Sequence, residues 1–216
     1  MVIKRLAGGT ALLLSVLVGH QWALAQPQVD DGGRSAYLTG KRANNSSERR
    51  RHFSAGAAQA RDRLSKAPDD PAGLLWLAAN LGAEALERGK FAALNVLGEM
   101  ERLLLRLEAT SPLYDHAAAA RTLARLYHKA PPFISIGSKK KARLYWEQTL
   151  ARAGDHPANL VLAADFFADD GQSARAKELA ARYLANPVTV AENPDAGEWQ
   201  EIARRIAGPR APGAGR

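Results

Sequence analysis

A 34-residue repeat in the second half of the chain constrains the fold more than any other feature of the sequence. Gly137 and Gly171 are 34 residues apart, and so are Ala142 and Ala176. A period of this length is typical of two helices joined by a turn. Because such a pair cannot bury its apolar face alone, we expect helical hairpins that stack on one another.

The rest of the chain between residues 48 and 207 agrees with this expectation. Alanine and leucine dominate and β-branched residues are sparse, which favours helices over strands. Helix-starting residues follow the breaks, at Asp70–Pro71, Ser111–Pro112, Ser138 and Ser173. About eight helices with short connections should pack as antiparallel neighbours. The sequence therefore predicts an all-α fold, an α-solenoid of antiparallel helical hairpins.

One hairpin contains an insertion. Leu123 and Tyr127 align with Ala163 and Phe167 at an offset of 40, six more than the repeat. The extra residues lie within Ala130–Ile136, which reads Pro-Pro-Phe-Ile-Ser-Ile after the alanine. This loop is apolar, so we expect it to pack on its own hairpin, with contact to a partner as the alternative.

The repeat positions also support a family resemblance. A small residue where two helices cross, an aromatic residue one turn later and a proline after the second helix occur at Ala164, Phe167, Gly171, Ala176, Leu184 and Pro187. The span from about Glu48 to Pro187 resembles the tetratricopeptide-repeat superfamily. Ala180, where an aromatic residue is expected, and Gly154, in place of a terminal proline, depart from its pattern.

The segment from Leu126 to Ala142 resembles a narrower group, the periplasmic tetratricopeptide-like component associated with TRAP transporters. It contains Tyr-His-Lys-Ala-Pro-Pro and, further on, Ile-Gly-Ser-Lys-Lys-Lys-Ala. The glycine-containing loop before a charged second helix is the feature shared with that group. This resemblance implies a protein that works beside a transporter.

The N-terminus predicts export. Lys4 and Arg5 precede an apolar run over Leu6–Val18, and Ala23–Ala25 supplies small residues for cleavage after Ala25. The run is shorter than the roughly 20 residues that span a bilayer, so we expect a cleavable signal peptide over residues 1–25. The chain has no cysteine, which excludes a lipid anchor on cysteine and any disulfide. We expect a periplasmic or secreted protein.

The mature chain then divides into three parts. Residues 26–47 show no apolar period and predict a flexible lead-in with Tyr37–Leu38 as a docking point. Residues 48–207 form the helical repeat domain, and residues 208–216 predict a disordered tail. Loss of the signal lowers the formal net charge from +8 to +6, which is 28 basic minus 22 acidic residues. Export argues against nucleic acid as the partner, and no later segment is apolar for long enough to span a membrane.

The resemblance places a binding groove on the concave face, formed by the first helix of each hairpin. Arg121, Arg125 and His128 should form one basic stripe there, with Asp165 equivalent to Arg125 in the next hairpin. Trp76 is the aromatic residue that we expect in the groove. Such a stripe would bind a carboxylate or an acidic peptide. The alternative is a solvated face on which Arg125 pairs with Asp165.

A second candidate is an anion site at Ser138, Lys139 and Lys140, at the start of a predicted helix. Backbone N–H groups, a hydroxyl and ammonium groups can together bind an anion. The alternative is a charge run tolerated on the surface. None of the five histidines has metal-ligand spacing, and the serines lack a nucleophile elbow. We therefore expect no metal, no cofactor and no enzymatic activity.

These observations lead to two functional hypotheses. The first is an exported helical-repeat binding protein that mediates protein–protein interaction in the periplasm, with another periplasmic or envelope protein, such as a transporter component, as its partner. The second is a carrier of a small ligand, an organic acid or an apolar molecule, beside a TRAP-type transporter. An open groove would favour the first hypothesis and an enclosed pocket the second.

Overall fold

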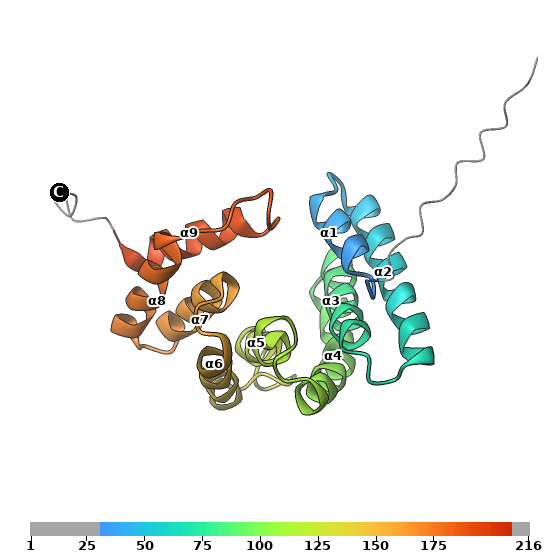
Figure 1. The fold of residues 1–216 in the computed structure, drawn as a ribbon, viewed down its shortest axis with the longest axis horizontal. Coiled ribbons are helices and arrows are strands. Elements are labelled where there is room, and N and C mark those ends of the chain that lie inside the picture. Colours follow the sequence, from blue (N-terminus) through green and yellow to red (C-terminus); the bar gives the residue numbers. More distant parts are fainter. Residues whose placement is uncertain (1–30, 209–216) are drawn as a thin grey trace, which may run out of the picture.

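The structure is a computed structural model that describes residues 31–208 (Figure 1). Within this range the chain forms nine helices and no strand, so the predicted all-α fold is confirmed. The helices are α1 (Arg34–Arg42), α2 (Ser46–Lys66), α3 (Pro71–Arg88), α4 (Lys90–Thr110), α5 (Tyr114–Lys129), α6 (Lys139–Ala153), α7 (Pro157–Asp169), α8 (Ser173–Ala185) and α9 (Ala196–Ala207).

The helices pack in series, each against the next along the chain, and the series curves into an arc. Figure 1 shows α1, α3, α5, α7 and α9 on the inner side of the arc and α2, α4, α6 and α8 on the outer side. The two ends of the arc approach each other. Lys41 of α1 forms an ion pair of 2.7 Å with Asp195, just before α9. The first helix is thereby linked to the last.

The 34-residue repeat corresponds to equivalent packing positions. Ala142 of α6 and Ala176 of α8 are both buried. Trp146 and Ala180 are also both buried, although they differ greatly in size. The two equivalent positions are therefore both core positions, occupied by side chains of very different volume.

The prediction of a flexible lead-in over residues 26–47 is wrong for residues 34–42, which form α1. The Asp31 carboxylate accepts a hydrogen bond of 2.8 Å from the Ser35 N–H at the start of this helix. Tyr37 then packs between Phe53 and Trp76, with ring centroids 5.7 and 5.6 Å apart. Tyr37 therefore attaches α1 to α2 and α3, as the predicted docking point at Tyr37–Leu38 implies.

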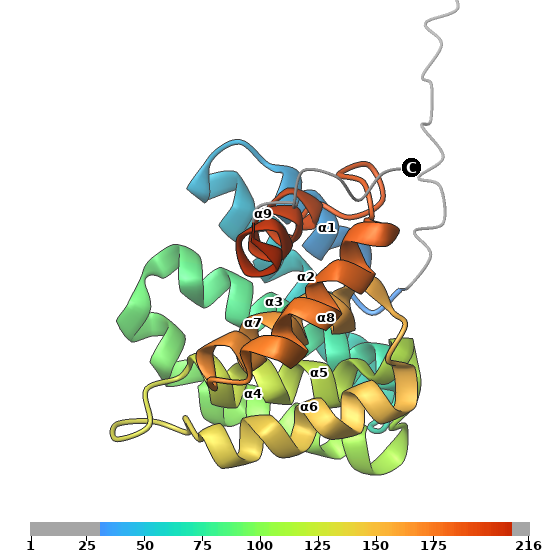
Figure 2. The same ribbon diagram turned by 90° about the vertical axis from the view of Figure 1, so that its left-hand side faces the viewer.

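The α5–α6 loop does not pack on its own hairpin as expected. Phe133 is 98% exposed and Ile134 is 76% exposed, and only Ile136 packs against the core. The base of the loop is narrow, because the Ser138 N–H donates 2.9 Å to the Tyr127 carbonyl. The residues between therefore project from the body of the protein, as Figure 2 shows.

Two predicted segments lie wholly or largely outside the described residues, namely the signal peptide over residues 1–25 and the tail over residues 208–216, of which only Gly208 is described. Across residues 31–208, none of the helices combines the length and the apolar character that crossing a membrane requires.

Candidate binding site

A groove on the inner side of the arc lies between α5, α7 and α9. We call it the inner groove, and its volume is about 520 Å³. Three cations, three carboxylates and one apolar side chain line it: Arg125, Lys129, Arg205, Asp165, Glu198, Glu201 and Ile202. The groove is therefore balanced in charge, whereas the sequence predicted a basic stripe.

Asp165 of α7 lies at the centre of an ion-pair network. Its carboxylate is 2.8 Å from the Lys129 Nζ of α5 and 3.2 Å from an Arg205 guanidinium nitrogen of α9. The side chain is only 10% exposed, so both cations offset the cost of burying its charge. The alternative pairing of Asp165 with Arg125 is not observed, because Lys129 and Arg205 occupy the carboxylate. The sequence analysis did not predict Arg205 as a groove residue, because it lies in α9, after the end of the repeat.

Arg125 lines the same groove but has no hydrogen-bond or ion-pair partner among the described residues. Its Nη1 atom is buried and unsatisfied. An unpaired buried guanidinium N–H costs about 1–3 kcal/mol, so a bound acceptor would recover that free energy. Burial raises the pKa of Tyr37, and the nearby Lys41 ammonium acts in the opposite direction.

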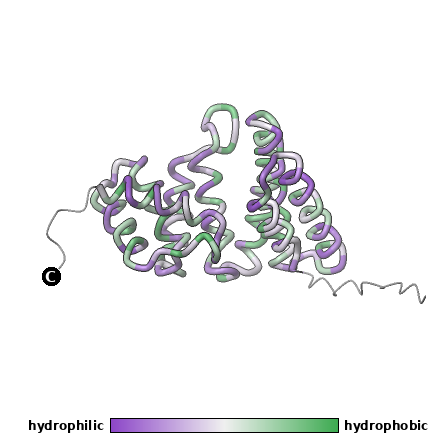
Figure 3. Tube along the Cα trace, turned by 90° about the horizontal axis from the view of Figure 1, so that it is seen from above, coloured by the Kyte–Doolittle hydropathy of each residue, from purple (hydrophilic) through white to green (hydrophobic). Residues whose placement is uncertain are grey.

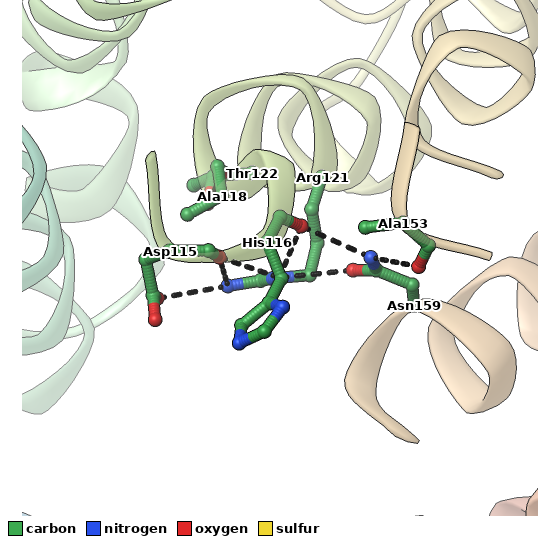
Figure 4. Close-up of polar contacts among 7 residues, drawn as sticks. All are labelled: Asp115, His116, Ala118, Arg121, Thr122, Ala153 and Asn159. Carbon is green, nitrogen blue, oxygen red and sulfur yellow. Dashed lines mark hydrogen bonds and ion pairs between the residues drawn. The ribbon is translucent and has the colours of Figure 1, made fainter. Parts of the chain in front are cut away.

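Arg121 does not face the inner groove, contrary to the sequence prediction. Figure 4 shows its guanidinium between Asp115 and Asn159. It donates 2.9 Å to the Asn159 side-chain oxygen, lies 3.3 Å from the Asp115 carboxylate and donates 3.3 Å to the His116 carbonyl. Its side chain is only 13% exposed, and burial lowers its pKa. These contacts give Arg121 a structural role.

The backbone beside Arg121 explains this arrangement. Asp115, His116 and Ala117 have φ values of 45°, 56° and 60°, so three consecutive non-glycine residues adopt the left-handed conformation. Each costs roughly 1–2 kcal/mol relative to a right-handed turn. The His116 carbonyl accepts hydrogen bonds from both Arg121 and Asn159 (Figure 4). Arg121 and Asn159 therefore satisfy a strained turn that the sequence gave no reason to expect.

His128 is likewise committed to the fold. Its Nε2 atom lies 2.9 Å from the Asp169 carboxylate, its side chain is 6% exposed, and burial lowers its pKa. His128, Asp165 and Asp169 have ligand atoms within 4.8 Å of one another, a spacing that could hold a cation. The Lys129 ammonium, however, lies 2.8 and 3.4 Å from the two carboxylates. This cluster is therefore explained as an ion-pair network.

Two of the three residues of the predicted anion site at the start of α6 form hydrogen bonds within the protein. The Ser138 hydroxyl accepts a hydrogen bond of 3.3 Å from the Lys141 N–H and so caps the helix. The Lys139 ammonium donates 3.3 Å to the Asp169 carbonyl. Lys140 is exposed. These three residues do not converge on one point, so the geometry favours the alternative of a surface charge run.

Trp76 lies on α3 and is covered by α1. Its ring packs against Tyr37, and the Arg34 guanidinium lies 5.9 Å from its centroid. The side chain is part-buried, so it forms part of the wall between α1 and α3. It does not line the inner groove, which is bounded by α5, α7 and α9.

A second hollow, of about 830 Å³, lies where the end of α6 and the start of α7 meet α8. Its arginines are paired: Arg152 with Glu108, Arg175 with Glu147, and Arg182 with Asp155. The arginines of this hollow are therefore engaged, unlike Arg125 of the inner groove, although the buried Nδ1 atom of His156 in its lining has no partner in the described part of the chain.

Comparison with known proteins adds no family to this description. No family model matches the chain, and no curated protein matches it either. The fold and the groove define the chain as an all-helical, solenoid-like protein with a charge-balanced groove on its inner face.

Proposed function

We propose that this chain is an exported helical-repeat binding protein that engages a segment of another periplasmic or envelope protein in the inner groove. The observation that supports this proposal best is Arg125, an inner-face arginine whose Nη1 atom is buried without a partner beside an open groove. The helical repeat also supports it, because such scaffolds present extended inner surfaces to their partners.

The lining of the groove defines the chemistry of the bound segment. Lys129 and Arg205 are paired with Asp165, which leaves Arg125 as the cation that can receive a carboxylate through two N–H groups. Glu198 and Glu201 face the same space and would repel a second carboxylate. A segment with one carboxylate and a nearby cation therefore fits better than a uniformly acidic peptide.

A small-ligand carrier is the second candidate. The Lys41–Asp195 ion pair supports this reading, because a link between the two ends of the arc would limit access to the inner face. Such a ligand would again need a carboxylate for Arg125. A bound organic acid would fit the groove volume of about 520 Å³.

One set of measurements on the mature chain distinguishes the protein-binding function from the carrier function. We expect the wild-type protein to retain a protein partner from periplasmic extract, and Arg125→Gln to weaken that retention about tenfold, as for the loss of one charge-assisted contact. Arg61→Gln, an exposed arginine on the outer helix α2, is the matched control. Native mass spectrometry of the purified protein would show a carrier instead through a co-purified small acid. Equal retention by Arg125→Gln and wild type would refute the groove as the site.

A further inference from the structure

Two turns on one side of the molecule expose large apolar side chains, and we call this side the apolar edge. The α3–α4 turn exposes Leu86 by 67% and Phe91 by 86%, and the α5–α6 loop exposes Phe133 by 98% and Ile134 by 76%. Figure 2 shows both turns projecting on the same side of the helices. Figure 3, which colours the chain by hydropathy, shows that hydrophobic and hydrophilic stretches alternate along the helices and turns.

Positive charge accompanies each apolar tip. Lys90 precedes Phe91, and Lys140 follows the α5–α6 loop; both lysines are exposed. Neither has an acidic side chain within ion-pair distance among residues 31–208. The edge therefore combines projecting apolar side chains with uncompensated ammonium groups.

The acidic side chains near these turns are neutralised by other partners. Glu84 pairs with Arg88 at 2.6 Å, and Glu87 pairs with Arg49 at 2.7 Å. Asp169 pairs with the Lys129 ammonium at 3.4 Å. The charge presented by the apolar edge is therefore positive, which disfavours a second copy of the same edge as the occupant.

We propose that the apolar edge docks the protein onto an anionic lipid surface. Phe91, Phe133 and Ile134 would enter the boundary between headgroups and acyl chains, and Lys90 and Lys140 would contact lipid phosphates. The tips are convex and separate, so they suit a fluid surface that deforms around each of them better than a rigid protein face. The proposal concerns a surface apart from the inner groove and does not depend on it.

Sedimentation with vesicles tests this proposal on the full mature chain. We expect the protein to pellet with vesicles of three parts phosphatidylcholine to one part phosphatidylglycerol and to remain in solution with phosphatidylcholine alone. Replacing Lys90 and Lys140 by alanine should weaken binding about fivefold for each lysine. Phe91→Ser combined with Phe133→Ser should abolish pelleting. Both substitutions are at exposed positions, and an unchanged melting temperature will show that the variants fold.

Leu113→Ser provides the matched control. Leu113 is 68% exposed and follows the other end of α4, away from the apolar edge, so this variant should bind vesicles as the wild type does. Arg125→Gln should also bind normally, which separates this surface from the groove. Equal pelleting with neutral and anionic vesicles, or no pelleting at all, would overturn the proposal. Retention on an acidic polypeptide column without vesicle binding would assign the edge to an acidic protein instead.

Discussion

The left-handed turn at the start of α5 allows a stability prediction with an internal control. Ala117 and Ala118 are adjacent and both fully buried, but Ala117 has a φ of 60° whereas Ala118 continues the right-handed helix. Glycine adopts a positive φ without the steric penalty that a Cβ atom causes. Replacing each alanine by glycine removes one fully buried methyl group, so the difference between the two variants reports chiefly on the backbone conformation.

The magnitudes follow from this geometry. Ala118→Gly loses a buried methyl group and helix propensity, about 1 kcal/mol each, so its unfolding free energy should fall by about 2 kcal/mol. Ala117→Gly loses the methyl group but relieves a left-handed penalty of about 1–2 kcal/mol, so its net change should be close to zero. Ala117→Gly should therefore be more stable than Ala118→Gly by about 2 kcal/mol.

Urea denaturation followed by far-ultraviolet circular dichroism measures this difference. For a domain of this size, each kcal/mol corresponds to a shift of about 2–4 °C in melting temperature, so thermal denaturation gives a second reading. Ala119→Gly, at another buried position of the right-handed helix, should behave like Ala118→Gly. If Ala117→Gly destabilises the protein as much as these two variants do, the left-handed turn is not strained and the reasoning fails.

Two further predictions concern the same region. Arg121→Ala should lower the unfolding free energy by about 2–4 kcal/mol, because buried acceptors lose their donor, whereas Arg61→Ala should change it by less than about 0.5 kcal/mol; urea denaturation compares them. Burial, followed by Arg121 and His116, lowers the pKa of His156 to about 4 from the ordinary 6.5. The unfolded chain therefore takes up a proton first as pH falls, so stability should decrease from pH 6.5 towards pH 4 and be flat above. Because His156 is only part-buried, solvent screening limits the loss to about 1–2 kcal/mol. His156→Gln should lack this component; a pH profile identical to that of the wild type would contradict the assignment.

The architecture was largely predictable from the sequence because it depends on local signals. The Ser138 cap of α6 and the Asp70 cap of α3 are formed as predicted, since an N-cap needs only a side-chain oxygen beside its own helix. The first helix was missed because its stability comes from distant residues. Tyr37 contacts Phe53 and Trp76, which are 16 and 39 residues away in the sequence. A pattern within the short segment around Tyr37 cannot predict such contacts.

The candidate site was less predictable, because side-chain direction depends on the path of the backbone. A regular helix would place Arg121 and Arg125 on one face. In the structure Arg121 instead turns to the carbonyl groups of a left-handed turn that contains no glycine, and glycine is the usual sequence signal for that conformation. Arg125 is one turn further along α5 than Arg121 and forms no hydrogen bond with the left-handed turn, and it lines the groove as predicted.

The ion-pair network explains why Arg125 remains available in a groove with three carboxylates. Asp165 connects Lys129 of α5 to Arg205 of α9, so three inner helices are joined through one buried carboxylate. Lys129 and Arg205 therefore already have a carboxylate partner, and Arg125 is the cation of the groove that has none within residues 31–208. Because Arg125 takes no part in that network, a bound carboxylate could pair with it without breaking the Asp165 ion pairs. Binding at Arg125 should therefore leave the curvature of the arc unchanged, as expected of a preorganised site.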